Sequence, residues 1–126
     1  MALYESNYIR LSALAGPLVA LRGEHRSCVP GDCDLVLKVT ERCPYTTTFL
    51  LTYRLRSDPP EEYPDMSVRI YHDARLAESQ QWLPAKAEER ELDQRWARNV
   101  MLNKWLEYCL ERGHRFSSAA EPFTAP

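Results

Sequence analysis

The side chains best suited to chemistry are concentrated in residues 64–74, which read Pro-Asp-Met-Ser-Val-Arg-Ile-Tyr-His-Asp-Ala. Arg69 and Tyr71 suit contact with an anionic, planar ligand, because a guanidinium group forms paired hydrogen bonds with phosphate or carboxylate oxygens. His72 and Asp73 are the residue types that acid–base catalysis uses, since imidazole changes its charge near neutral pH. Which of these side chains share a surface depends on the secondary structure that carries them.

Residues 66–73 alternate between apolar and polar side chains, which predicts a β-strand. Adjacent side chains on a strand point to opposite faces, so His72 and Asp73 are not expected to hydrogen-bond each other. Parity places His72 on the apolar face and Glu41, from an earlier strand, on that same face. The sequence therefore predicts a buried structural contact between Glu41 and His72, and an acid–base role for the two is the alternative.

Residues 33–41 and 45–56 alternate in the same way and are separated by a turn at 42–44. Consecutive strands with short connections predict an antiparallel meander with one apolar and one polar face. The side chains expected on the polar face are Lys38, Thr46, Thr48, Thr52, Arg54, Ser67, Arg69, Tyr71, Asp73 and Arg75. The ligand-binding residues predicted among them are Arg69, Tyr71, Asp73, Arg54 and Lys38. The competing interpretation is a solvent-exposed sheet face, which is ordinarily polar without any ligand.

Two helices are expected to cover the apolar face. Residues 3–15 and about 88–112 carry apolar side chains at helical spacing, with Gly16-Pro17 ending the first and Gly113 the second. Residues 17–32 are predicted to be mainly loop, with a possible short strand at 18–21, and residues 57–64 an exposed loop. The predicted fold is α+β, an antiparallel sheet of three to four strands with both helices packed on one face. Aromatic residues of the second helix left outside this contact would favour a homodimer or a partner.

The totals describe an ordinary globular chain. Its 126 residues predict a single domain over 1–115 with a flexible tail over 116–126. A net charge of −2 gives no general reason to bind nucleic acid or a membrane surface, and no run reaches the roughly 18 apolar residues of a membrane span. The N-terminus lacks the features of a secretory signal, so we expect a cytoplasmic protein whose four cysteines are reduced. Their spacing does not predict a metal site, and nothing predicts a cofactor.

Four ordered segments resemble the small bacterial family DUF1249, and together they touch most of the chain up to Gly113. These segments are Leu3-x-Glu5-x-Asn7-Tyr8-x-x-Leu11-x-x-Leu14, Glu41 with Tyr45-Thr46-Thr47, Pro64 to Ala74, and Asn99-x-Met101-Leu102-x-x-Trp105-Leu106-x-Tyr108-Cys109-Leu110-x-x-Gly113. The resemblance implies a cytoplasmic protein without assigned chemistry. It also implies a gene that often neighbours those for an ADP-ribose pyrophosphatase and a cyclic-AMP phosphodiesterase. Between Ala77 and Asp93 the chain looks shorter than its relatives.

Together these observations favour a small cytoplasmic accessory or regulatory protein over an enzyme. It is expected to bind an anionic, nucleotide-like small molecule or a protein partner through the polar sheet face. The alternative is a hydrolase of a phosphorylated metabolite, with Asp73 or His72 as the acid–base group.

Overall fold

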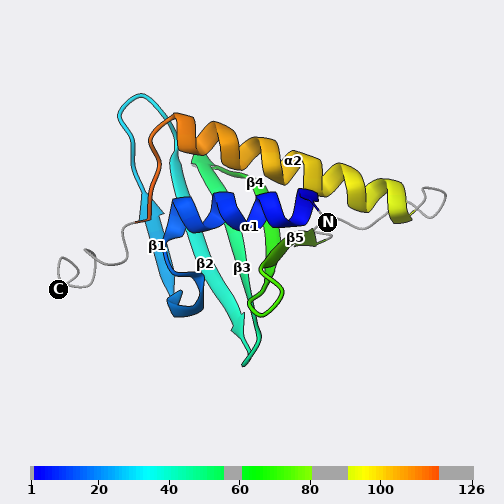
Figure 1. The fold of residues 1–126 in the computed structure, drawn as a ribbon. Coiled ribbons are helices and arrows are strands. Elements are labelled where there is room, and N and C mark those ends of the chain that lie inside the picture. Colours follow the sequence, from blue (N-terminus) through cyan, green and yellow to red (C-terminus); the bar gives the residue numbers. More distant parts are fainter. Residues whose placement is uncertain (1, 56–60, 81–90, 117–126) are drawn as a thin grey trace.

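Two helices and a five-stranded antiparallel sheet make up the fold, as Figure 1 shows. The structure, a computed structural model, describes residues 2–55, 61–80 and 91–116, with the side chains of 55, 61–65 and 91–94 left out. In chain order the elements are α1 (Ala2–Ala15), the 3₁₀ helix η1 (Leu18–Ala20), β1 (Glu24–Ser27), β2 (Asp34–Arg42), β3 (Thr46–Leu55), β4 (Glu61–Tyr71), β5 (Leu76–Gln80) and α2 (Glu91–Glu111). The strands lie in sequence order, each antiparallel to the next, so the predicted α+β meander is confirmed.

The sheet has two more strands than the alternation revealed. The four residues of β1 are mostly polar, and they lie in a stretch where Gly23 and Pro30 suggested a loop. β5 follows a tight turn in which Arg75 has a φ of 56°, and its sequence Leu-Ala-Glu-Ser-Gln is short and only weakly apolar. Residues 18–20 form a 3₁₀ helix where a strand was possible, and β4 begins at Glu61, inside the predicted loop. The shortened connection before the second helix lies partly at 81–90, outside the described residues.

Both helices cover the same face of the sheet (Figure 1) and enclose one core with it. Alternate residues of the three central strands supply most of the sheet's share of the core, as period-two packing requires, and Ala77 of β5 adds to it. The largest fully buried apolar side chains are Leu11, Leu14, Leu21, Leu35, Leu37, Phe49, Leu51, Met66, Ile70, Leu102 and Leu106. The two helices run in the same direction across the strands, from the β5 side toward β1 (Figure 1).

The chain leaves α2 through a glycine-dependent cap. The N–H of His114 donates to the carbonyl of Cys109 and the N–H of Gly113 to that of Leu110, the pair of bonds that defines a Schellman motif. Gly113 has a φ of 96°, which explains why a glycine stands there. Phe116 then returns to the core with 4% of its surface exposed, and its N–H donates to the carbonyl of Leu14. The prediction that residue 116 begins the tail is therefore wrong, and residues 117–126 lie outside the described part.

Two buried asparagines join the helices to the outer edge of β5. The side-chain oxygen of Asn99 accepts the backbone N–H of Ser79 at 2.7 Å, and Nδ2 of Asn7 donates to the carbonyl of Ala77 at 3.3 Å. Asn7 also bonds Asn99 at 3.3 Å, and Nδ2 of Asn103 on α2 donates to Oδ1 of Asn7 at 3.0 Å. Since unpaired backbone groups are costly to bury, this network explains how α1 and α2 can pack against an edge strand.

The outer surface of the helices retains several large apolar side chains. Trp105 is buried, whereas Trp96, Met101 and Tyr108 are exposed, as expected for residues outside the contact with the sheet.

Among the helices in the described ranges, none is long and apolar enough to cross a membrane.

Candidate functional site: the polar face of the sheet

The sheet face opposite the helices, here called the polar face, carries most of the side chains selected from the sequence. Alternation and register place on it Lys38, Glu41, Thr46, Thr48, Leu50, Thr52, Arg54, Ser67, Arg69, Tyr71 and Glu78. One row crosses four strands in register, because Glu41 pairs with Thr48, Thr48 with Arg69, and Arg69 with Glu78. An arginine thus stands in a row with two carboxylates.

Arg69 already has partners within the chain. Its Nε donates to Oγ1 of Thr48 at 3.3 Å, and its Nη2 lies 3.8 Å from Oε1 of Glu41. The two charged side chains are 36% and 57% exposed, so this ion pair is screened by water and contributes little to stability. An anionic ligand would have to compete with Glu41 for the guanidinium group, but the pair is loose enough to be exchanged for another carboxylate.

Tyr71 is tied to the edge strand by its hydroxyl group, which donates to Oε2 of Glu78 at 2.7 Å. Burial raises the pKa of Tyr71, the bond to Glu78 raises it further, and Arg69 acts in the opposite direction. The phenol therefore remains a neutral donor, and its orientation is fixed by Glu78.

Glu41 lies on the polar face, not on the apolar face that strict alternation predicted. The register of β2 against β3 shifts between Val39 and Glu41, a β-bulge that adds one residue and reverses the parity after it. The hydroxyl of Thr40, within the bulge, donates to the carbonyl of Thr48 at 3.2 Å. The predicted contact between Glu41 and His72 is therefore wrong, since Glu41 pairs with Arg69 instead.

His72 does lie on the apolar side, at its margin, where Nε2 contacts Oγ1 of Thr47 at 2.8 Å. Its Nδ1 is buried without a hydrogen-bond partner in the described chain. Burial lowers the pKa of His72, as does the charge of Arg42, while Asp73 acts in the opposite direction. The ring is therefore a neutral, half-buried group with one nitrogen engaged and the other inaccessible.

Asp73 and Arg75 do not share the polar face with Arg69. The strand ends at Tyr71, and both residues are exposed in the turn before β5, so the prediction that they extend this surface is wrong. Lys38 is exposed on the polar face, one strand position from the bulge, and Arg54 lies opposite Asp34 in the register. The five predicted ligand-binding residues are thus divided between the sheet surface and the turn.

The centre of the polar face is small and partly apolar, and charged groups surround it. Val36, Thr48 and Thr52 are 6%, 7% and 5% exposed although none is part of the hydrophobic cluster under the helices, and Leu50 on β3 is half-buried. The charged side chains around them are Arg26, Asp34, Lys38, Glu41, Arg54, Arg69 and Glu78. Because those three side chains are already buried within the chain, the polar face presents Leu50 and the surrounding charged groups to solvent.

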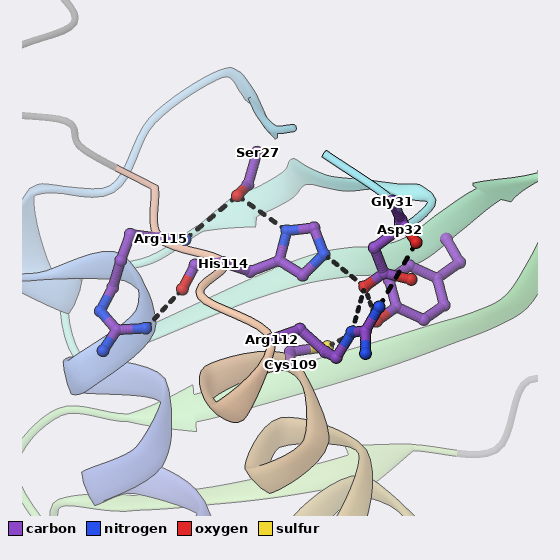
Figure 2. Close-up of polar contacts among 8 residues, drawn as sticks. Ser27, Gly31, Asp32, Cys109, Arg112, His114 and Arg115 are labelled. Carbon is purple, nitrogen blue, oxygen red and sulfur yellow. Dashed lines mark hydrogen bonds and ion pairs between the residues drawn. The ribbon is translucent and has the colours of Figure 1, made fainter. Parts of the chain in front are cut away.

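A second polar cluster, centred on His114, was not found from the sequence (Figure 2). The imidazole is fully buried, with Nδ1 2.9 Å from Oγ of Ser27 and Nε2 3.0 Å from Oδ2 of Asp32. Oγ of Ser27 also accepts the N–H of Arg115 at 3.1 Å, and Nε of Arg112 lies 3.7 Å from Oδ2 of Asp32. The cluster fastens the segment after α2 to β1 and to the turn before β2.

The cluster continues into the core through Tyr53, whose hydroxyl donates to Asp32 at 3.2 Å and lies 3.5 Å from Sγ of Cys109. Burial acts to raise the pKa of Asp32, but bonds from the Cys33 N–H, His114 and Tyr53 outweigh it, so this pKa lies below its ordinary value. Burial, followed by the neighbouring Cys109 and Asp32, raises the pKa of Tyr53, and burial raises that of Cys109 to about 11. The result is one carboxylate that accepts hydrogen bonds from His114, Tyr53 and the Cys33 N–H, with the Arg112 guanidinium beside it.

Hydrogen bonds connect Ser27 to His114 and His114 to Asp32, as in the catalytic triad of a hydrolase, but the geometry favours a structural role. Ser27 is 5% exposed and its hydroxyl is already bonded on both sides, so it is poorly placed to attack a substrate. Because a hydroxyl either donates or accepts, Ser27 satisfies Nδ1 of His114 in both charge states of the ring. No sequence pattern predicts the cluster, because Ser27 and Asp32 are separated from His114 by 87 and 82 positions.

The fold defines an α+β domain in which both described helices cover one sheet face and no described helix covers the other. Comparison with known proteins places the chain in a family. Residues 10–115 match the family described as "Protein of unknown function (DUF1249)", and the chain belongs to it. The chain is similar to the protein named "Uncharacterized protein YqiB" of Escherichia coli strain K12, with 33% identity over 123 residues, 90% of this chain and 87% of the relative. The proteins of that name from strains CFT073 and O157:H7 match to the same extent, and no solved structure matches.

Proposed function

We propose that the chain is a cytoplasmic binding protein without catalytic activity, which recognises a protein partner through the polar face of its sheet. The observation that carries the proposal is the arrangement of this face, which presents Leu50 at its centre within a rim of side chains of both charge signs. A sheet face that the described helices leave uncovered gives a partner a flat surface to pack on.

The rim favours a protein partner over an anionic metabolite. Arg69 would supply the positive charge for a phosphate or carboxylate, yet its neighbours in the row are Glu41 and Glu78. A free anion gains little from a cation that a carboxylate already contacts, whereas a protein surface carries groups of both signs and can pair with the whole row. Glu41 and Arg69 are the contacts that we expect to matter most.

The geometry gives the hydrolase alternative less support. A general base must reach the proton it abstracts, but one nitrogen of His72 contacts Thr47 and the other is buried. Asp73 lies in an exposed turn and not in a concave site that could enclose a substrate.

A pair of exposed lysines allows a matched test. A photo-crosslinking amino acid at Lys38, on the polar face, should form a discrete covalent adduct in cells, while the same group at Lys104, on the exposed side of α2, should not. Arg69→Glu should remove the Lys38 adduct if the rim contributes to recognition. The absence of any adduct specific to Lys38 would refute the proposal, and a thermal shift with nucleotides that Arg69→Ala abolishes would favour an anionic ligand instead.

A further inference from the structure

Glu41 and Arg69 lie at equal distances on the two sides of β3, and they carry opposite charges. Glu41 on β2 and Arg69 on β4 are both register partners of Thr48, so they lie one strand to either side of β3. The next residue of β3 on the same face is Leu50, which is half-buried and pairs with Lys38 on one side and Ser67 on the other. A two-fold axis along β3 would therefore exchange a negative position with a positive one.

We propose that the partner of the polar face is a second copy of this chain, stacked face to face about a two-fold axis parallel to β3. This inference rests on the proposed function and names its partner. With sheets packed about 10 Å apart and their strands aligned within roughly 30°, β2 of one chain lies over β4 of the other. Glu41 of each chain then faces Arg69 of its partner, which gives two symmetric ion pairs from one set of contacts.

The same axis brings the small, apolar centre of each face against itself. Leu50 and Thr48 lie on β3, the strand that both chains superpose, and Leu50 is the largest apolar side chain among the centre residues. Thr48 is 7% exposed and Arg69 already bonds its hydroxyl, so packing against a copy leaves that hydroxyl partnered. Leu50 packs against its counterpart at the centre of the contact, and the flanking charges fix the register of the two sheets. The axis also brings Arg54 of each β3 toward its copy, with its register partner Asp34 beside it.

The existing intrachain contact does not oppose this arrangement. Nη2 of Arg69 and Oε1 of Glu41 are 3.8 Å apart, and both side chains are partly exposed to water. The attraction between the two charges becomes stronger when a partner chain excludes water and places a second pair beside them. In a square of four alternating charges, two from each chain, each charge has two neighbours of opposite sign, which offsets the cost of removing the pairs from water. Tyr71 and Glu78 flank the square and keep its polar edge hydrogen-bonded at 2.7 Å.

Charge-reversal variants test the inference through complementation between chains. Sedimentation of the wild-type protein should give twice the 14.6 kDa of one chain, with a concentration-dependent return to monomer. Glu41→Arg places only arginines in the square and Arg69→Glu only glutamates, so each variant alone should dimerise about tenfold or more weakly than wild type. An equimolar mixture of the two should recover the dimer, because every Arg then faces a Glu. Glu41→Arg/Arg69→Glu in one chain should also dimerise, and Lys104→Glu, on the helical surface, should not change association.

The outcomes separate the inference from the proposed function. A wild-type protein that remains monomeric at all soluble concentrations overturns the inference, as does a mixture that stays monomeric while both variants keep wild-type circular dichroism. If the Lys38 crosslinker then captures a different protein, the proposed function stands and only the identity of the partner is wrong. If Lys38 gives no adduct of any mass, both fail.

Discussion

Asp32→Asn should be among the most destabilising single-atom changes in the protein. The carboxylate is 10% exposed and accepts hydrogen bonds from Nε2 of His114 at 3.0 Å, the hydroxyl of Tyr53 at 3.2 Å and the Cys33 N–H. Asparagine keeps one acceptor oxygen but turns an NH₂ group toward these donors. A hydrogen bond to a charged group contributes roughly 1.5–3 kcal/mol, and the bonds are not additive, so we expect a loss of about 3 kcal/mol in the free energy of unfolding.

Thermal and urea denaturation measure this loss directly, and for a domain of this size it corresponds to a fall of about 10 °C in Tm. Because the folded pKa of Asp32 is below its unfolded value of 3.8, its stabilisation is present above that pH and disappears as the pH falls through the folded pKa. The difference between wild type and variant should therefore shrink in acid. Glu107→Gln, which removes a carboxylate from an exposed position on α2, is the control and should change little.

The account would be refuted if Asp32→Asn had the same free energy of unfolding as the wild type. It would also be refuted if the difference in this free energy between the two proteins did not depend on pH. Either result would mean that the bonds around His114 contribute no more to folding than an exposed polar contact.

Three further changes test other parts of the molecule. Asn99→Ala removes the acceptor for a β5 backbone N–H at 2.7 Å, so we expect a loss of about 2 kcal/mol and faster hydrogen exchange in β5, measured by NMR; unchanged exchange would contradict the edge contact. Glu78→Gln should lower the raised pKa of Tyr71, measured by ultraviolet titration of the phenol. An unchanged titration curve would show that Glu78 does not influence Tyr71. The Cys109 thiol, buried and with a pKa of about 11, should resist a thiol reagent that labels the exposed Cys43 until the protein is unfolded; equal rates in the folded protein would contradict its burial.

Alternation predicted the fold class and most of the polar face because burial on one side of a sheet constrains every second residue. It placed Lys38, Arg69 and Tyr71 on one surface, and the structure bears this out. It failed for Glu41, because parity counting assumes an unbroken strand and a single bulge residue reverses every assignment beyond it. It failed for Asp73, because nothing in the alternation marks where the strand yields to the turn.

The His114 cluster and the asparagine network lay beyond sequence reasoning for a different reason. Their members are polar residues that become neighbours only when the helices dock on the sheet, so local periodicity carries no signal for them. Asn7 and Asn99 did occur in the segments that carry the resemblance to DUF1249, but a polar residue in a helix suggests solvent before it suggests a strand edge.

The asparagine contacts to β5 also restrict how this chain can aggregate. A sheet usually grows by adding a strand to the exposed backbone of its edge, which is the route to domain swapping and amyloid. On β5 the Ser79 N–H and the Ala77 carbonyl are already satisfied by side chains from both helices, so an incoming strand would first have to separate those helices from the sheet. Addition of a strand at β5 therefore requires the core to open. The tendency to aggregate through this edge should then depend on the free energy of unfolding of the whole domain.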